Sequence, residues 1–379
     1  MFFGQKIHPL NFDCAERSRI DGEGVELIGP GVRLRVACAS ILDGCLRLRI
    51  ENGHSTDRTQ CSDAVVPDCR AGQAVPPRLE TDGALFEAAA GRVELQPARL
   101  RLELAGVSLA TVADGIGGCG EALLLNFALT GVEGCYGLGE RTGRLNKLGG
   151  SADFLTVDVV AVFRHTYARD DYDPTYVAIP LAIFKIGERF LGLFFDNAGR
   201  AVMDAGKSKP GEFWYQSFGG TTDLYLLAGP TLRDVTRRYA ALTGRAPPPP
   251  PWALGYHQCR WGYRHEREFR ELAARFAAAD VPVSALWYDI DYMDEYRLFT
   301  WDSTDFPDPA GLNRELKAAG IRAVTIVDPG VKREPGYAVY DSGRERDVFC
   351  RTASGREYVG KVWPGDTVFP DFTLESARE

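Results

Sequence analysis

Hydrophobic and polar residues alternate along many short segments between the N-terminus and about residue 230. The clearest alternating segments are residues 32–36, 46–50 and 100–104. A period of two predicts antiparallel strands with one buried face, and the Gly, Asp and Pro residues between the segments predict turns. Residues 176–185, 190–195 and 223–227 are more continuously apolar, which is expected of strands that are covered on both faces. We therefore predict a β-sandwich in this part of the chain.

A helix is predicted where this β-rich region ends. Its apolar positions, which recur at helical spacing, are Leu232, Val235, Tyr239 and Leu242. Thr231 and Asp234 form a capping signal before them and Gly244 follows them, so the segment carries both a start and a stop signal. Five consecutive prolines, residues 247–251, come next. Because proline fixes the backbone and donates no hydrogen bond, we interpret this run as a stiff boundary between two domains.

Beyond the prolines, predicted strands and helices alternate. The strands are expected at residues 252–257, 281–289 and 321–327, and the helices at residues 266–279 and 309–319. This order indicates parallel βαβ units. Strand starts about 30 to 40 residues apart are typical of a (β/α)₈ barrel, although three strands alone also fit an open doubly wound sheet.

The chain is therefore expected to contain two domains. Residues 1–245 are predicted to form the β-sandwich, and residues 246–379 the first strands and helices of a (β/α)₈ TIM barrel. The length of 379 residues supports this division, because single hydrophobic cores rarely grow beyond ~250–300 residues. The residues after 327 are too few to supply the other strands of a closed barrel, so we expect the barrel to be truncated within this chain.

Composition and charge limit the classes of partner. Hydrophobic residues make up 45% and charged residues 25% of the chain, as in ordinary globular proteins. The formal net charge is −8 and Lys and Arg do not cluster, which argues against a nucleic-acid partner. The longest apolar stretches, such as residues 190–195, fall far short of the ~20 residues of a membrane span, so we expect no membrane association.

The cysteines and the first residues bear on location. Nine cysteines are scattered from Cys14 to Cys350 without a Cys-x-x-Cys pair, and no Asn-x-Ser/Thr glycosylation signal is present. The segment Met1-Phe-Phe-Gly-Gln-Lys6 lacks the apolar core of a secretory signal. Reduced, mostly buried thiols in a cytoplasmic protein are the simplest interpretation.

Polar residues follow the predicted strands of the second domain, where barrel enzymes place their chemistry. Asp289 ends the second strand and is followed by Asp291 and Asp294, and we favour a functional carboxylate at Asp289 over a solvated strand end. Asp328 precedes Pro-Gly, so it can serve a site or build a turn. For His257, at the end of the first strand, a packed core histidine is favoured.

Aromatic residues recur beside these strand ends, at Trp261, Trp287 and Trp363. Sugar rings present apolar C–H faces that stack on such side chains, while carboxylates accept hydrogen bonds from sugar hydroxyls. Because aromatic residues belong more often to a core, their clustering with carboxylates is the stronger argument. The pattern favours a sugar-binding site.

Two Gly-rich segments of the first domain have other interpretations. Gly115-Ile-Gly-Gly-Cys-Gly120 matches the dinucleotide-binding pattern G-x-G-x-x-G, but it lies among alternating strands. Residues 123–130 after it are predicted as a strand rather than the required helix, so we interpret the match as coincidence. Residues 134–143 are predicted to be a turn.

Four motifs of the second domain occur in order. They are Trp252-Ala-Leu-Gly-Tyr-His-Gln-Cys-Arg-Trp-Gly262, Trp287-Tyr-Asp-Ile-Asp-Tyr-Met-Asp294, Ile326-Val-Asp-Pro329, and Gly360-Lys-Val-Trp-Pro-Gly365 with Phe369-Pro-Asp-Phe372. With them the chain resembles the α-glucosidases of glycoside hydrolase family 31. Tyr136-Gly-Leu-Gly-Glu-Arg141 and Tyr172-Asp-Pro-Thr-Tyr-Val-Ala-Ile-Pro180 are similar to that family's N-terminal signatures, so the resemblance reaches back to about residue 130. It implies a galactose-mutarotase-like sandwich before a TIM barrel.

The resemblance further implies a retaining exo-α-glucosidase that acts on terminal non-reducing glucose of α-linked oligosaccharides. Asp289 is expected to bind hydroxyls of that glucose, and Asp158 to be the family's carboxylate from a sandwich loop. The residues expected to wall the pocket are Trp261, Trp287, Ile290, Ile326 and Trp363. Residues 289–294 are similar to the α-glucosidase branch and unlike the α-xylosidases, so glucose is favoured over xylose. No metal or cofactor is expected.

The family's catalytic carboxyl groups have no counterpart among the motifs of this sequence. The nucleophile of the family is an Asp in a Trp-x-Asp-Met-Asn-Glu-Pro-like motif, and its acid/base is a later Asp. Neither motif occurs in residues 1–379, so we expect both groups beyond Glu379 and no activity from this portion alone. The alternative is a non-catalytic carbohydrate-binding or regulatory protein. Linkage preference, transglycosylation or lyase chemistry, and oligomeric state stay open.

Overall fold

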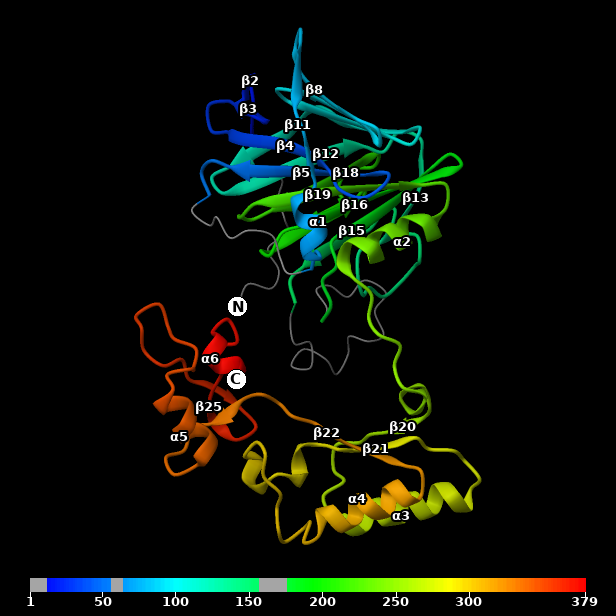
Figure 1. Cartoon of the computed structure of the whole chain (residues 1–379), viewed down its shortest axis with the longest axis vertical. Helices are drawn as coiled ribbons and strands as arrows, with labels where there is room; N and C mark the ends of the chain where they lie inside the picture. Colours follow the sequence, from blue (N-terminus) through cyan, green and yellow to red (C-terminus); the bar gives the residue numbers. More distant parts are fainter. Residues whose placement is uncertain (1–11, 56–63, 157–175) are drawn as a thin grey trace. The chain divides into compact units, whose positions relative to one another are not determined.

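The computed structural model describes residues 12–55, 64–156 and 176–379 (Figure 1). The chain divides into two compact units, Met1–Ala246 and Pro247–Glu379. The division falls directly before the proline run, residues 247–251. Unit 1 is rich in antiparallel strands, whereas unit 2 contains the parallel strands of the chain's described part.

One sheet of unit 1, here called the β12 sheet, has ten strands over the described residues. Their bounds are β1 Asp13–Cys14, β7 Pro77–Glu80, β8 Gly83–Ala88, β9 Gly91–Gln96, β10 Arg99–Leu104, β11 Val107–Cys119, β12 Ala122–Ala128, β14 Ser151–Phe154, β17 Ala201–Ala205 and β18 Glu212–Ser217. The order is β14-β17-β18-β12-β11-β10-β9-β8-β7, and β1 pairs with β11. The strand predicted at 100–104 is confirmed as β10.

The second sheet, here called the β19 sheet, has nine strands over the same described part of unit 1. Their bounds are β2 Arg17–Asp21, β3 Gly24–Ile28, β4 Arg33–Ser40, β5 Cys45–Asn52, β6 Gln73–Val75, β13 Val132–Gly137, β15 Leu181–Ile186, β16 Arg189–Asp196 and β19 Thr222–Gly229. The order is β13-β15-β16-β19-β5-β4-β3-β2, and β6 pairs with β4. The predicted strands at 46–50, 190–195 and 223–227 are confirmed.

Aromatic side chains from the two sheets meet in one core. Phe195 of the β19 sheet stacks on Tyr215 of the β12 sheet, with ring centroids 4.1 Å apart. Phe184 of the β19 sheet and Phe213 of the β12 sheet also make contact, edge to face, with ring centroids 4.9 Å apart. All four side chains are fully buried. Such rings contribute large apolar areas to a core, and the predicted β-sandwich is confirmed.

Helix α2, Leu232–Thr243, covers the outer face of the β19 sheet (Figure 1). The Thr231 hydroxyl accepts a hydrogen bond from the Asp234 amide at 3.2 Å, as the capping signal predicted. A Cβ on Gly192 of β16 would lie 2.7 Å from Val235 Cγ1, so the helix and the strand pack too closely for any larger residue there. This second layer explains why β16 and β19 are apolar on both faces. A shorter helix, α1, comprises Pro67–Ala71.

Unit 2 begins with a βαβαβ arrangement. Strands β20 His257–Gln258, β21 Ala285–Tyr288 and β22 Arg322–Thr325 are parallel and adjacent in that order. Helices α3 Glu266–Ala278 and α4 Pro309–Ala318 connect them and lie side by side (Figure 1). Both predicted helices and the parallel pairing are confirmed, and this is the start of a TIM barrel.

The remaining elements of unit 2 are short. Two 3₁₀ helices follow β21, η3 Ile290–Tyr292 and η4 Asp294–Tyr296. An antiparallel sheet has the order β23-β25-β24, with bounds β23 Val331–Lys332, β24 Gly360–Val362 and β25 Gly365–Val368. Helices α5 Ala338–Glu345 and α6 Glu375–Arg378 complete the described chain.

The predicted strand at 252–257 is wrong over most of its length. Pro251–Leu254 form a 3₁₀ helix, η2, and strand pairing starts only at His257. The Ala253 amide donates to the Pro250 carbonyl at 2.9 Å. Because the prolines before it have no N–H for a sheet ladder, the proline run leads into this turn instead of a strand.

Two predictions in unit 1 are also corrected. Part of 134–143, predicted as a turn, belongs to β13 and pairs with β15. In 176–185 the strand starts only at Leu181, because Pro180 before it cannot donate to the ladder. The segment 115–120 lies in β11 and the turn after it, so its interpretation as a coincidental dinucleotide motif is confirmed.

Two further features of the described residues concern its helices and its cysteines. Among them, no helix combines the length and the apolar character that crossing a bilayer requires. Eight of the nine cysteines belong to the described part of the chain, and all eight are free thiols.

We predict that residues 1–245 fold without unit 2, because the two sheets and α2 already enclose the aromatic core. Circular dichroism of this segment should show β-structure, and limited proteolysis should leave one resistant fragment. An aggregated or fully digestible segment would contradict the prediction.

Candidate active site

The ends of the parallel strands bring the candidate residues to one edge of the sheet. Tyr288 pairs with Thr325, so β21 and β22 end at the same level, and β20 ends at Gln258, which pairs with Leu286 two residues before the end of β21. Residues that follow β20, β21 and β22 therefore lie at the carboxyl edge. In barrel enzymes this edge carries the active site.

Side chains along β21 alternate between two environments. Leu286 and Tyr288 are fully buried against the helices, where Tyr288 stacks on Phe269 of α3 at 4.2 Å. Trp287, and Asp289 directly after the strand, are only partly buried. Because successive side chains of a strand point to opposite faces, Trp287 and Asp289 share the face away from the helices. That is the face on which a barrel builds its pocket.

Asp289 is held by the turn that follows the strand. Its Oδ1 accepts a hydrogen bond from the Ile290 amide at 2.8 Å and caps η3. Its Oδ2 lies 4.0 Å from Cys259 Sγ, which is a weak thiol contact. Burial, and then the Asp289 carboxylate, raise the pKa of the Cys259 thiol. One oxygen of Asp289 thus fixes the backbone, and the other faces a neutral thiol at the end of β20.

The His257 imidazole bridges the Trp287 indole and the Trp252 carbonyl near the start of unit 2. Trp287 Nε1 donates to His257 Nδ1 at 3.3 Å, and His257 Nε2 lies 3.2 Å from the Trp252 carbonyl. An accepting Nδ1 carries no proton, so this network assigns the neutral Nε2–H tautomer to His257. The Trp252 ring stacks on the imidazole at 5.7 Å with a 14° interplanar angle. His257 is therefore a packed, hydrogen-bonded histidine that orients Trp287.

A second group of residues forms around two exposed tryptophans. Trp261 and Trp363 have exposed fractions of 59% and 50%, and their ring centroids lie 5.5 Å apart. Trp363 occupies the turn between β24 and β25, and its Nε1 donates to Asp328 Oδ2 at 2.9 Å. Trp261 comes two residues after Cys259, which links this group to Asp289 through the chain after β20.

The two isoleucines lie deeper than the tryptophans. Ile290 is 3% exposed and belongs to the apolar core of unit 2, and Ile326 packs partly buried against that core. The Ile326 amide donates to the Tyr288 carbonyl at 2.9 Å, which continues the β21–β22 pairing by one residue. Ile290 thus follows Asp289 directly in the chain, and Ile326, directly after β22, lies next to Tyr288 of the neighbouring strand. Asp158, the remaining predicted residue, lies outside the described residues.

The three acids of the motif at 289–294 have different environments. The Asp291 side chain is 7% exposed, its Oδ2 lies 3.4 Å from Arg264 Nε, and its Oδ1 accepts from the Tyr296 hydroxyl at 3.4 Å. Burial, and then the Asp291 charge, raise the pKa of Tyr296. Asp294 is 53% exposed and pairs with Arg297 at 3.0 Å. Asp289 is the acid of the three on the open face of β21.

Sequence reasoning missed two contacts in this region. It proposed no role for Cys259, which reaches Asp289, and it left the role of Asp328 open between a site and a turn. Both contacts join residues that are 30 or more positions apart in the chain. The motifs themselves contain all four residues, but no spacing rule indicates which pairs meet.

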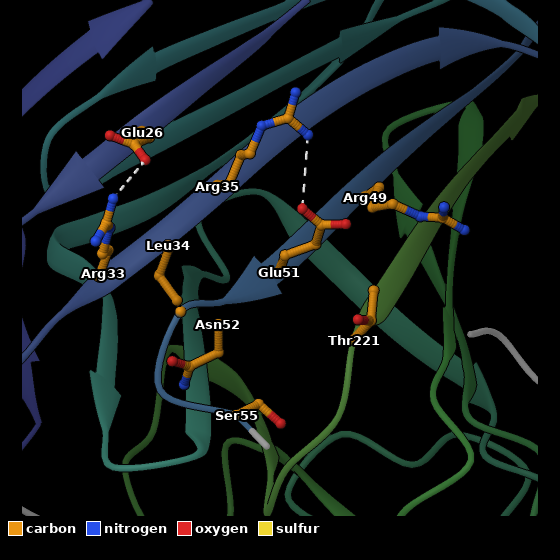
Figure 2. A pocket seen from close by; sticks show the side chains of 10 residues that line it. Glu26, Arg33, Leu34, Arg35, Arg49, Glu51, Asn52, Ser55 and Thr221 are labelled. Atoms are coloured by element: carbon orange, nitrogen blue, oxygen red, sulfur yellow. Dashed lines mark hydrogen bonds and ion pairs between the residues drawn. The ribbon is translucent and has the colours of Figure 1, made fainter. Parts of the chain in front are cut away.

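A cavity in unit 1 has a different chemistry. It measures about 460 Å³ and lies over β3, β4 and β5 (Figure 2). Glu26 and Arg33 are 3.1 Å apart and Arg35 and Glu51 are 3.5 Å apart, so the charges along its walls are paired. Hydrogen bonds from Arg19 and Arg33 lower the pKa of Glu26. No aromatic ring is among the described residues that line it, which makes it a poor stacking site for a sugar.

Two protein-family models match the chain. The model "Glycosyl hydrolase 31 N-terminal galactose mutarotase-like domain" matches residues 76–204, and "Glycosyl hydrolases family 31 TIM-barrel domain" matches residues 246–379. The first match begins well before residue 130, so the family likeness extends further into unit 1 than its motifs indicated.

Several characterised relatives are named as α-glucosidases. The chain is 42% identical over 244 residues to alpha-glucosidase 2 of Bacillus thermoamyloliquefaciens, which covers 64% of the chain and 30% of that protein. It is 34% identical to the alpha-glucosidase of Saccharolobus solfataricus, covering 69% and 36% respectively. It is 33% identical to human neutral alpha-glucosidase AB, and the match covers 67% of this chain and 29% of that protein. The chain thus spans about a third of the length of these relatives.

Solved structures share the fold. A family 31 dextranase of Flavobacterium johnsoniae, complexed with isomaltotriose, aligns with a TM-score of 0.80 at 21% identity, over 96% of this chain and 44% of that chain. The glucosidase II alpha subunit bound to Glc1Man2 aligns with a TM-score of 0.80 at 22% identity, over 97% of this chain and 48% of that chain. At these identities the likeness concerns the fold alone.

We predict that Asp289→Asn speeds the alkylation of Cys259 by iodoacetamide at neutral pH. Asparagine removes the charge that raises the thiol pKa, and a unit charge ~4 Å away contributes about 1 kcal/mol in water, or roughly fivefold in thiolate fraction. Peptide mass spectrometry of the labelled chain reads out Cys259 separately from the other cysteines.

Asp294→Asn is the matched control, because Asp294 lies in the same segment and pairs with Arg297 rather than with Cys259. Equal labelling rates in wild type and Asp289→Asn, or an equal increase in the control, would show that Asp289 does not face the thiol.

Proposed function

Because the chain belongs to glycoside hydrolase family 31, we propose that the complete protein is a retaining exo-α-glucosidase acting on terminal non-reducing glucose of α-linked oligosaccharides. The observation that carries the proposal is the position of Asp289. It ends the second parallel strand on the face that also carries Trp287, beside a capping turn that holds the carboxylate. The α-glucosidase names of the relatives support this substrate class.

In this proposal the described residues supply sugar recognition. Asp289 Oδ2 accepts hydrogen bonds from glucose hydroxyls, which suits a carboxylate whose other oxygen is already occupied by the Ile290 amide. Trp261, Trp287 and Trp363 offer rings to the apolar faces of the sugar. Ile290 and Ile326 support these walls from the apolar core of unit 2.

The chemical step requires two further carboxyl groups. A retaining glycosidase uses a nucleophile and an acid/base roughly 5–5.5 Å apart. Asp289 and Asp328 are engaged with the Ile290 amide and the Trp363 indole, which suits binding and positioning rather than this pair of roles. We propose that the nucleophile and the acid/base come from sequence outside residues 1–379, whose motifs do not include them.

We predict that Asp289→Asn lowers kcat/KM of the complete protein on an α-glucoside severely, on the order of 10³-fold or more, because a site built around substrate hydroxyls depends on each polar partner. Asparagine can still accept from the Ile290 amide, so the thermal unfolding midpoint should hardly change. Steady-state kinetics with maltose measure the loss.

Asp294→Asn again serves as the control and should retain kcat/KM, because its side chain is exposed and lies in an ion pair. Wild-type kinetics in Asp289→Asn would remove this residue from the site. If the wild-type complete protein binds glucosides without turning them over, the non-catalytic alternative replaces the proposed hydrolase.

Residues 1–379 alone are predicted to show no turnover of p-nitrophenyl α-glucoside or maltose. Three parallel strands do not close a barrel, and the binding groups alone cannot form a glycosyl-enzyme intermediate. The measurement compares purified residues 1–379 with the complete protein at equal concentration. Comparable specific activity from residues 1–379 would place the nucleophile within them.

A further inference from the structure

Asp328 stands at the point where the chain leaves β22 and turns toward β23. The Gly330 amide donates to the Asp328 carbonyl at 2.7 Å, so Asp328, Pro329 and Gly330 form a tight turn. The carboxylate of Asp328 leaves this turn and accepts from Trp363 Nε1 at 2.9 Å. The turn and the tryptophan are 35 residues apart in the chain.

The backbone brings these two residues together. Val331 pairs with Val368 and Lys332 with Thr367, so the strand after the turn joins the β24–β25 hairpin that carries Trp363. A Cβ on Gly330 would lie 2.7 Å from Thr367 Cγ2 and 3.0 Å from Val362 Cγ2. The turn therefore packs directly on the hairpin. This packing and the strand pairing hold the Asp328 carboxylate next to the Trp363 indole.

Trp363 needs such a partner to keep one orientation. Its side chain is 50% exposed at the tip of a hairpin, and its ring meets Trp261 at 5.5 Å with a 53° interplanar angle. A half-exposed indole can adopt several rotamers unless a directed bond selects one. The bond from Trp363 Nε1 to Asp328 Oδ2 is such a directed bond.

We infer that Asp328 is a positioning residue that holds Trp363 in the orientation in which it meets Trp261, and is neither a sugar ligand nor an acid–base group. The effect on sugar binding rests on the proposed function, whereas the Asp328–Trp363–Trp261 arrangement does not. Asp328 acts as a hydrogen-bond acceptor here, so its oxygen matters more than its negative charge.

The pair Asp328→Asn and Asp328→Ala separates these roles. Asparagine keeps a side-chain oxygen that can accept from the indole, while alanine removes it. If Asp328 served as a charged ligand or as a proton donor, both variants would fail alike. If it positions Trp363, asparagine rescues what alanine loses.

The first measurement uses residues 1–379 and needs no activity. Two indoles 5.5 Å apart and inclined to each other couple their electronic transitions and give a paired positive and negative band in circular dichroism. We expect Trp261→Phe and Trp363→Phe each to abolish that signal, Asp328→Ala to remove most of it, and Asp328→Asn to retain most of it. Thermal melts of each variant show that the fold is kept.

A wild-type chain without the coupled signal, or an Asp328→Ala variant that keeps it in full, would overturn the inference. So would an Asp328→Asn variant that loses the signal as completely as Asp328→Ala. These outcomes do not depend on which sugar the protein binds.

The second measurement is kinetic and uses the complete protein. Asp328→Ala should raise KM for maltose roughly tenfold with a smaller change in kcat, since a loosened wall weakens binding of substrate and transition state alike. Asp328→Asn should stay close to wild type. In a double-mutant cycle with Trp363→Phe, which lacks the N–H, the second substitution should add little to the first.

Equal losses in Asp328→Asn and Asp328→Ala, or additive effects in the cycle, would overturn the positioning role. An inactive wild-type protein would instead contradict the proposed function, and the circular dichroism signal would then decide the role of Asp328 on its own.

Discussion

The alternation of side chains along β21 is the constraint on which the candidate site depends. Tyr288 stacks on Phe269 at 4.2 Å and fixes which face of the strand meets the helices. Trp287 and Asp289 must then point the other way, because a strand turns successive side chains to opposite faces. A shift of one residue would bury the carboxylate in an aromatic core, at a large desolvation cost. The apolar contact behind the strand therefore positions the polar group in front of it.

Environment, more than residue type, separates the carboxylates of unit 2. Asp291 is almost fully buried beside Arg264, whereas Asp294 is exposed and paired with Arg297. Asp289 caps a turn with one oxygen and faces Cys259 with the other. Asp328 accepts from an indole. Among these four acids, Asp289 combines a fixed orientation with a place on the open face of a barrel strand, which is the combination that recognition of a substrate hydroxyl requires.

Local signals predicted much of this fold, and tertiary contacts account for what they missed. The cap at Thr231 and the apolar spacing behind it indicated α2 correctly, and strand ends pointed to Asp289. The strand predicted at residues 252–257 is mostly a 3₁₀ helix, because apolar content alone does not distinguish a strand from a turn. Contacts such as Asp328 with Trp363 join distant segments through packing at Gly330, and a single sequence contains no pattern that specifies them.

Two of the tryptophans of the site are held in orientation by a hydrogen bond from the indole N–H. The indole N–H of Trp287 donates to His257 at the end of β20, and that of Trp363 donates to Asp328 after β22. Each ring is thus oriented by a hydrogen-bond acceptor that lies at the end of another strand or just after it. Fixing a ring before the ligand arrives reduces the conformational entropy that binding would otherwise lose. A flat, weakly directional stacking surface becomes selective for one sugar orientation only when its rings are held in this way, because stacking alone tolerates many poses.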